Sequence, residues 1–270
     1  MKHRAGDTEW IKSFYDSAAG WWGESWYEGQ NLAGRLKIVQ QFAPAADQRI
    51  LELAAGTGET AAYLCDHGYP VLAVDLARKN IELMRKYQAT RPNLRVLEGD
   101  ILELSLSERF PTVCMFESFG FGADREQQAL LRKIDAEWLS PGGVLILDVY
   151  HPVGPIRASG SRHELDRLEN VPGSVDMIEY SYYDPVNSRW IDIWEPKQDP
   201  QNRKMQSIRC YTPADFLLLA QGCGLAIEAM LYNSQPFAFD AGEITYGDEL
   251  FDPSAVDASY AYTVVMRKRR

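Results

Sequence analysis

The chain is poor in cysteine and histidine, and neither residue is spaced for metal binding. It contains four cysteines, Cys65, Cys114, Cys210 and Cys223, with no C-x-x-C pair and no histidine at metal-ligand spacing. Scattered single cysteines do not make a disulfide framework, and they are typical of buried thiols in a reducing compartment. We therefore expect no metal site.

Long apolar runs and basic patches are also missing. The first ten residues lack the apolar stretch of a signal peptide, and no segment approaches the roughly 20 apolar residues that span a bilayer. Lys and Arg number 28 against 38 Asp and Glu, and the only basic run is Arg267–Arg270. Because nucleic-acid binding needs clustered cations, these absences favour a cytoplasmic protein with neither a nucleic-acid nor a membrane partner.

Short apolar runs alternate with amphipathic segments through the middle of the chain. The expected strands are 50–53, 71–74, 94–97, 112–116 and 144–149, and the expected helices are 59–66, 78–89 and 125–139. Such alternation implies βαβ units. The sequence therefore predicts an α/β fold, doubly wound, around a mostly parallel sheet buried on both faces.

Two aromatic-rich segments flank this pattern. Residues 1–43 contain two expected helices and a dense aromatic set, Phe14, Tyr15, Trp21, Trp22, Trp26 and Tyr27. Residues 176–183 and 189–194 are expected to form an antiparallel hairpin, with a third strand at 204–211. We divide the chain into an N-terminal helical lid (1–43), an α/β core (44–150), an antiparallel substrate-side insertion (151–211) and the remainder of the core (212–270).

The most informative motif is the stretch 49–62, RILELAAGTGETAA. A strand enters a turn containing Gly56 and Gly58 and then a helix, which presents backbone N–H groups to a ligand. The glycine spacing also satisfies the dinucleotide fingerprint of NAD-dependent enzymes. A pyrophosphate there would, however, lie close to Glu52 and Glu59, and like charges in a cleft repel. The carboxylates favour S-adenosylmethionine, which carries an ammonium and a sulfonium but no phosphate.

Two further carboxylates follow the next two expected strands. Asp75 ends the second strand, where it can accept hydrogen bonds from a ribose, and Asp100 follows the third, where it can meet an adenine amine. Leu76 and Ile101 would supply apolar walls. Because the carboxyl ends of parallel strands share one edge, we expect these residues to form one site.

These motifs together resemble those of the class I S-adenosylmethionine-dependent methyltransferases. The motifs are residues 52–59, 74–76, 99–101, 116–120 and 139–143, and the resemblance covers roughly residues 32–150 with the last helix and two strands. It implies a seven-stranded sheet with an antiparallel last strand. With the carboxylates and aromatic side chains above, it gives these cofactor-binding residues: Tyr15, Trp22, Glu52, Ala54, Gly56, Gly58, Asp75, Leu76, Asp100, Ile101 and Phe116.

The insertion and the aromatic N-terminal helix are similar to the small-molecule branch of that family, such as sugar N,N-dimethyltransferases and glycine N-methyltransferases. An Asn/Asp-Pro-Pro-aromatic motif is missing after the fourth strand, where residues 117–120 stand. Nucleobase and glutamine methylation are therefore disfavoured. The lack of a metal cluster likewise leaves a catechol O-methyltransferase pattern unsupported.

His151 and Glu117 are the candidate catalytic residues. His151 follows the fifth strand, and its imidazole suits proton removal from a hydroxyl or ammonium nucleophile. The alternative is a loop histidine bonded to the backbone. Glu117 and Tyr150 are rival bases or substrate clamps, Arg157 could hold a carboxylate, and Trp26 belongs to the aromatic lid over the substrate.

The sequence thus predicts methyl transfer from S-adenosylmethionine to a nitrogen or oxygen of a small molecule, by in-line displacement in a dry cavity. Two alternatives stay open. One is a non-catalytic module that binds the cofactor for regulation, and the other is an NAD-dependent oxidoreductase.

Overall fold

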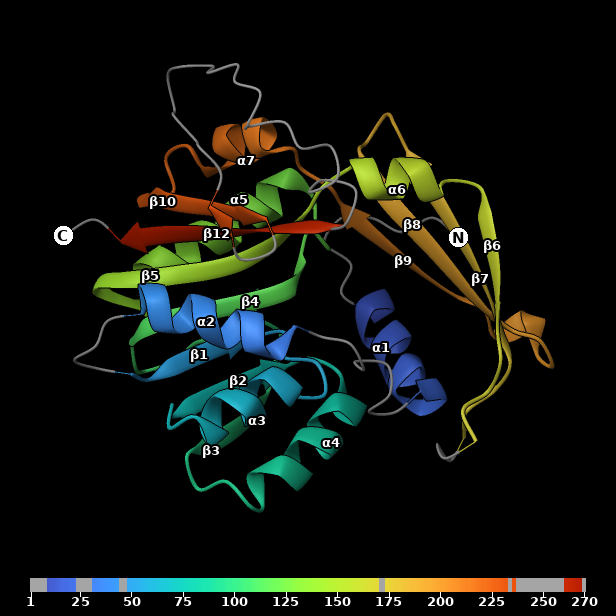
Figure 1. The fold of residues 1–270 in the computed structure, drawn as a ribbon, viewed down its shortest axis with the longest axis horizontal. Helices are drawn as coiled ribbons and strands as arrows, with labels where there is room; N and C mark the ends of the chain where they lie inside the picture. Colours follow the sequence, from blue (N-terminus) through green and yellow to red (C-terminus); the bar gives the residue numbers. More distant parts are fainter. Residues whose placement is uncertain are drawn as a thin grey trace.

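The computed structural model describes residues 9–22, 31–43, 48–169, 173–232, 235–236 and 260–268. These residues form a large sheet covered by helices and a second, smaller sheet beside it (Figure 1). No described helix is long and apolar enough to cross a membrane.

The main sheet has the strand order β11-β10-β12-β5-β4-β1-β2-β3. Its strands are β1 (Ile50–Leu53), β2 (Val71–Asp75), β3 (Leu94–Glu98), β4 (Phe110–Phe119), β5 (Leu139–Tyr150), β10 (Leu225–Tyr232), β11 (Gln235–Pro236) and β12 (Ala261–Lys268). The strands β1 to β5 pair in parallel, whereas β12 runs antiparallel to both β5 and β10. The predicted seven-stranded, mostly parallel sheet is confirmed, and the two-residue β11 extends its edge.

Helices cover both faces of the main sheet. They are α2 (Leu32–Phe42), α3 (Glu59–Asp66), α4 (Arg78–Gln88), α5 (Asp124–Lys133), the π-helical turn η2 (Ile134–Trp138) and α7 (Pro213–Ala220). Alternate strand residues enter two different cores: Leu51 and Leu53 pack with α5 and α7, whereas Ile50 packs with α2, α3 and α4. This double covering explains why the central strands are mostly apolar.

Helix α2 belongs to the α/β core rather than to a lid. Its Leu36, Ile38 and Val39 are buried in the same cluster as Ile50 of β1. The expectation that all of residues 1–43 form a lid was therefore too broad. Of its two expected helices, only α1 (Glu9–Trp22) lies between the main sheet and the second sheet (Figure 1).

The insertion is a four-stranded antiparallel sheet, in the order β6-β7-β8-β9. It contains α6 (Val153–Ala158), β6 (Ser161–Leu165), β7 (Met177–Asp184), β8 (Arg189–Pro196), the 3-10 turn η3 (Pro200–Asn202) and β9 (Lys204–Arg209). Apolar packing attaches α1 to this sheet, because Phe14 and Trp21 share a buried cluster with Met177. The insertion therefore faces the carboxyl ends of the main-sheet strands across α1.

One boundary differs from the expected pattern for a clear reason. The helix expected over 125–139 ends as a π-helical turn at Trp138, and β5 begins at Leu139 rather than at Val144. The β4–β5 register shifts between Phe110 and Thr112, and this shift accommodates the Pro-Gly-Gly sequence within β5. Gly142 lies there at φ +72°, a conformation that favours glycine.

Candidate cofactor and acceptor cavity

A cavity of about 440 Å³ lies at the carboxyl ends of the main-sheet strands. Its volume falls in the range of roughly 300–1,000 Å³ that is common for small-molecule sites. Helix α1, the main sheet and the insertion all contribute to its wall. The lining includes these predicted site residues: Tyr15, Glu52, Ala54, Gly56, Asp75, Leu76, Asp100, Ile101, Phe116, Glu117 and Tyr150.

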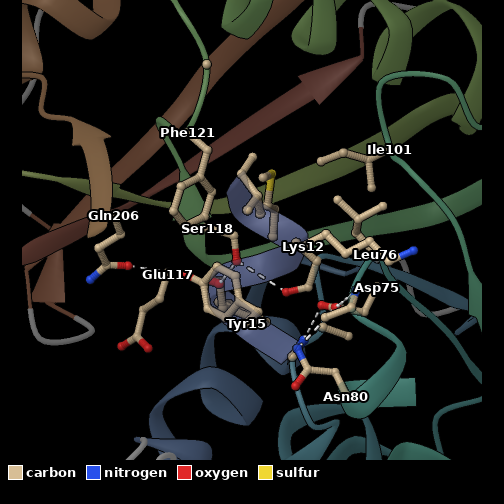
Figure 2. Close-up of a pocket in the computed structure, with 18 of the residues that line it drawn as sticks. Lys12, Tyr15, Asp75, Leu76, Asn80, Ile101, Glu117, Ser118, Phe121 and Gln206 are labelled. Carbon is tan, nitrogen blue, oxygen red and sulfur yellow. Dashed lines mark hydrogen bonds between the residues drawn. The ribbon is translucent and has the colours of Figure 1, made fainter. Parts of the chain in front are cut away.

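The cavity has two sides, which Figure 2 shows. Asp75, Leu76 and Ile101 lie on one side: Asp75 ends β2, Leu76 follows it, and Ile101 follows β3. Phe121 and Gln206 lie on the other side, toward the insertion. Tyr15 of α1 lies between them, with its ring edge-to-face against Phe121 at 5.8 Å between centroids.

The two glycines of the turn have different roles. Gly56 lines the cavity at φ +59°, and its N–H donates to Asp75 Oδ2 (2.8 Å). Gly58 is the N-cap of α3 at φ +92° and does not line the cavity. A Cβ at Gly58 would lie 2.3 Å from Met84 Cγ, so this glycine allows α4 to approach. The predicted cofactor contact at Gly58 is therefore not supported.

Asp75 is buried and already strongly hydrogen-bonded. Besides Gly56, its carboxylate accepts from the Ala77 N–H (2.8 Å) and from Asn80 Nδ2 (3.1 Å). Burial raises its pKa to about 6, although these hydrogen bonds oppose the shift. A carboxylate has about four acceptor positions, so roughly one is left for a ribose hydroxyl.

Glu52 is the most perturbed acid of the cavity. It is 2% exposed, and its Oε2 has no hydrogen-bond partner in the described part of the chain. Burial raises its pKa to about 8; Arg35 lowers it, and the nearby Glu59 and Asp75 raise it further. A buried carboxylate is costly to ionise without a counter-charge. Glu52 therefore fits a ligand that brings an ammonium group into the cavity.

The part of the cavity predicted to hold adenine is less enclosed than the part around Glu52. Asp100 is half-buried, and its Oδ1 accepts from the Leu102 N–H (2.9 Å). Leu76 and Ile101 are also half-buried and line the cavity. These residues can hold a flat, partly apolar base with a polar edge, as the resemblance implied.

Sequence reasoning missed Arg35, which organises the centre of the site. Arg35 is 7% exposed; its Nη1 donates to Thr60 Oγ1 (2.7 Å) and its Nη2 lies 3.2 Å from Glu117 Oε2. Its guanidinium lies 4.8 Å from the Phe116 ring centre. Glu117 adopts φ +51°, so the backbone turns where this ion pair forms. The sequence feature that could have indicated a buried Arg35 is its helical spacing with Leu32, Leu36 and Val39.

His151 lies outside the cavity, contrary to expectation. It is buried beside the rings of Tyr232 and Tyr262, and its Nδ1 accepts from the Val153 N–H (3.2 Å). Successive side chains at the end of β5 point to opposite faces, and Tyr150 is the one that faces the cavity. Burial lowers the pKa of His151. The structure therefore does not support His151 as the general base.

Of the three residues predicted on the substrate side, Tyr150 lines the cavity, Arg157 does not, and Trp26 is not described. Arg157 is exposed on α6, away from the cavity lining. Trp26 lies outside the described residues, and Trp22 ends α1 with a side chain that is likewise not described. Tyr150 does line the cavity, and its hydroxyl donates to the Glu117 carbonyl (3.0 Å).

The insertion supplies lining residues that were not predicted as site residues. They are Glu179, Trp190, Asp192, Trp194 and Gln206. The sequence feature that could have indicated them is the period-two spacing of Trp190, Asp192 and Trp194, which places these side chains on one face of a strand. Tyr15 links α1 to this face through its hydroxyl, which donates to Gln206 Oε1 at 3.5 Å.

Comparisons with known proteins agree with this architecture. The family described as "Methyltransferase domain" matches residues 50–143. The cypemycin N-terminal methyltransferase of Streptomyces sp. is 31% identical over 152 residues, which are 53% of this chain and 61% of that relative. The chain therefore matches about three fifths of that relative's length.

Two solved structures share the fold. The CcbJ methyltransferase of Streptomyces caelestis superposes with a TM-score of 0.68 at 22% identity, covering 89% of this chain and 90% of the other. The glycopeptide N-methyltransferase MtfA, complexed with S-adenosyl-L-methionine, gives 0.57 at 18% identity, covering 90% and 96%. Residues 50–143 thus match the methyltransferase domain family, and the chain shares the fold of these two methyltransferases.

Proposed function

We propose that this chain is an enzyme that transfers a methyl group from S-adenosylmethionine to a nitrogen or oxygen of a small molecule. The observation that carries the proposal is the buried carboxylate pair at the ends of β1 and β2. Glu52 offers an oxygen without a partner among the described residues, and Asp75 is held by backbone N–H groups beside it.

The cofactor side follows from these carboxylates. Glu52 would bind the ammonium group, Asp75 one ribose hydroxyl, and Asp100 with Leu76 and Ile101 the adenine. When bound, S-adenosylmethionine supplies an electrophilic methyl on a sulfonium. The reaction is an in-line displacement, in which the acceptor bonds to the methyl carbon and the carbon–sulfur electron pair stays on sulfur.

The chain's own contribution is to orient the acceptor and exclude water. Helix α1, acting as a lid, and the insertion would close the cavity from the side opposite the main sheet. Glu117 is the candidate proton acceptor, since its side chain is half-exposed in the cavity and is oriented by Arg35. Tyr150 suits a positioning role instead, because burial raises its pKa well above the ordinary value.

A small acceptor suits this cavity better than a nucleic acid. Its lining contains many more carboxylates than cations: Glu52, Asp75, Asp100, Glu117, Glu126, Glu179 and Asp192 against Lys12 and Arg35. Such a wall repels a phosphate backbone. One relative is named a cypemycin N-terminal methyltransferase and one structural neighbour a glycopeptide N-methyltransferase, which supports an acceptor other than a nucleic acid. The four free, buried cysteines support a cytoplasmic location.

Isothermal titration calorimetry with S-adenosylhomocysteine tests the proposal. We expect saturable binding that Asp75→Ala weakens at least about tenfold, because Asp75 holds both the Gly56 turn and the ribose position. NADH should give no heat. Binding of NADH in place of S-adenosylhomocysteine would favour the oxidoreductase, and cofactor binding without turnover on an acceptor panel would favour the non-catalytic module.

A further inference from the structure

One face of the insertion presents charge and aromatic rings to the cavity. Strand β8 contributes Trp190, Asp192 and Trp194, with Glu179 from β7 and Gln206 from β9 beside them. Asp192 pairs in register with Gln206, and Glu179 pairs with Trp194. Glu179 is therefore a diagonal neighbour of Asp192 on the same face of the sheet.

Asp192 is buried without a full set of partners. It is 1% exposed, and its Oδ2 accepts from Gln206 Nε2 (3.0 Å). Its Oδ1 is buried with no hydrogen-bond partner among the described residues. A well-packed protein pairs nearly all such atoms, so an unpaired carboxylate oxygen in a cavity wall indicates a position for a donor.

No ion pair of the described chain compensates this face. Neither Asp192 nor Glu179 forms an ion pair within the described ranges, and Arg35, one of the two cations in the cavity lining, is engaged by Glu117. Burial raises the pKa of Asp192 to about 6; burial and the charge of Asp192 raise that of Glu179 to about 7. Two carboxylates at short range in a cavity are stabilised by a shared positive charge.

The Trp190 indole beside them is held in a fixed position. Trp190 Nε1 donates to Ser181 Oγ (2.7 Å), and the Trp190 ring stacks on Tyr260 at 5.3 Å between centroids. The Trp190 and Tyr150 rings pack edge-to-face at 5.5 Å between centroids. The Tyr150 hydroxyl in turn donates a hydrogen bond to the Glu117 carbonyl. The acidic face is thus connected to the candidate reaction centre by packed aromatic rings, which attract cations.

We propose that Asp192, Glu179, Trp190 and Trp194 bind the ammonium group of the methyl acceptor, so that the substrate is a cationic amine. This inference rests on the proposed methyl transfer and narrows its nucleophile to nitrogen. For this amine, Asp192 or Glu179 accepts one proton from the ammonium and takes the role proposed above for Glu117. The freed nitrogen lone pair then bonds to the methyl carbon, while the carbon–sulfur pair stays on sulfur. The amine belongs either to a small molecule or to a peptide N-terminus.

Calorimetry on the full chain, saturated with S-adenosylhomocysteine, tests this site with matched probes. The probes are 2-phenylethylamine against 2-phenylethanol, and the dipeptide Gly-Phe against its N-acetylated form. We expect each free amine to bind at least about tenfold more tightly than its neutral partner, because a charge-assisted hydrogen bond is lost in the latter. Tighter binding of 2-phenylethylamine indicates a small-molecule source of the amine, and tighter binding of Gly-Phe indicates a peptide source.

Isosteric variants test whether Asp192 and Glu179 bind the amine. Asp192→Asn and Glu179→Gln should each weaken amine binding about tenfold or more while S-adenosylhomocysteine affinity changes less than about twofold. Glu195→Gln, on the same strand but outside the cavity lining, is the matched control. If Asp192→Asn does not fold, Glu179→Gln decides, since Glu179 is only half-buried.

Equal affinities for amine and neutral probes would overturn the inference. So would the lack of amine binding at millimolar concentration, or unchanged amine affinity in both variants. The amine titrations are repeated without S-adenosylhomocysteine. Failure of the cofactor product to bind therefore contradicts the proposed function, whereas failure of the amines contradicts the ammonium site.

Discussion

Arg35 Nη2 lies 3.2 Å from Glu117 Oε2 and 4.0 Å from Asp148 Oδ2, so one buried cation from α2 serves the ends of both β4 and β5. Asp148 is buried, and Thr263 Oγ1 donates to it (2.6 Å). Without Arg35, the buried Asp148 carboxylate would be left beside Glu117 with no ion pair in the described chain.

We therefore expect Arg35→Met to lower the free energy of unfolding by about 2–4 kcal/mol, because it leaves Asp148 uncompensated. Urea denaturation measures this loss. Lys37→Met, at an exposed position of the same helix, is the control. Equal losses in both variants would show that the Arg35 ion pairs contribute little.

Cofactor binding should release protons. In the free protein the pKa of Glu52 is about 8, so this side chain is mostly protonated at pH 7. A ligand ammonium beside it favours the ionised form, and binding then releases up to about one proton. The measurement is S-adenosylhomocysteine calorimetry in buffers with different ionisation enthalpies. Glu52→Gln should abolish the dependence on buffer, whereas Glu103→Gln, an exposed control, should keep it.

The unliganded protein should lose stability as the pH rises. The pKa of Glu52 rises from 4.5 to about 8 on folding and that of Glu179 from 4.5 to about 7, in both cases mainly because of burial. At a pH between the ordinary pKa of 4.5 and these raised values, the folded state binds more protons than the unfolded chain. The free energy of unfolding therefore falls with increasing pH. We expect a lower Tm at pH 8 than at about pH 5.5. Glu52→Gln should reduce the difference, and a Tm independent of pH would contradict the shifts.

His151→Ala should affect stability rather than the cofactor site. His151 is 9% exposed and packs beside two tyrosine rings, so its loss leaves a gap that costs about 1–3 kcal/mol. S-adenosylhomocysteine affinity, measured by calorimetry, should stay within about twofold. His67→Ala, at an exposed position, serves as the control. A large loss of affinity in a fully stable His151→Ala protein would contradict this expectation and indicate a role for His151 in the cofactor site.

The core of the fold could be predicted because its signals are local. Apolar runs and the turn at Gly56 depend on near neighbours, and β1 was predicted with the bounds Ile50–Leu53 that the structure has. The strand β6 was missed, because it is a polar edge strand whose residues are mostly exposed. The Pro-Gly-Gly segment signals a turn, yet the main sheet accommodates it inside β5 through a register shift.

The site was predictable where residues follow strand ends and unpredictable where the fold decides their direction. Asp75 and Glu52 line the cavity because they lie at the carboxyl ends of β2 and β1. His151 and Tyr150 are adjacent, and only the pleat of β5 determines which one faces inward. Asp192 could not be predicted as a site residue, because its place in the cavity wall depends on how the insertion sheet packs against α1.

Helix α1 meets its two neighbours in unlike ways. It shares a buried apolar cluster with β7 of the insertion, whereas its contacts with α4 include an exposed hydrogen bond from the Lys79 N–H to Asp16 Oδ1 (3.0 Å). The charge of Asp16 also raises the pKa of Asp75, so this boundary is acidic at the cavity's edge. S-adenosylmethionine carries a net positive charge and its demethylated product does not. The association rate of the cofactor should therefore fall with ionic strength, while that of the product stays nearly constant.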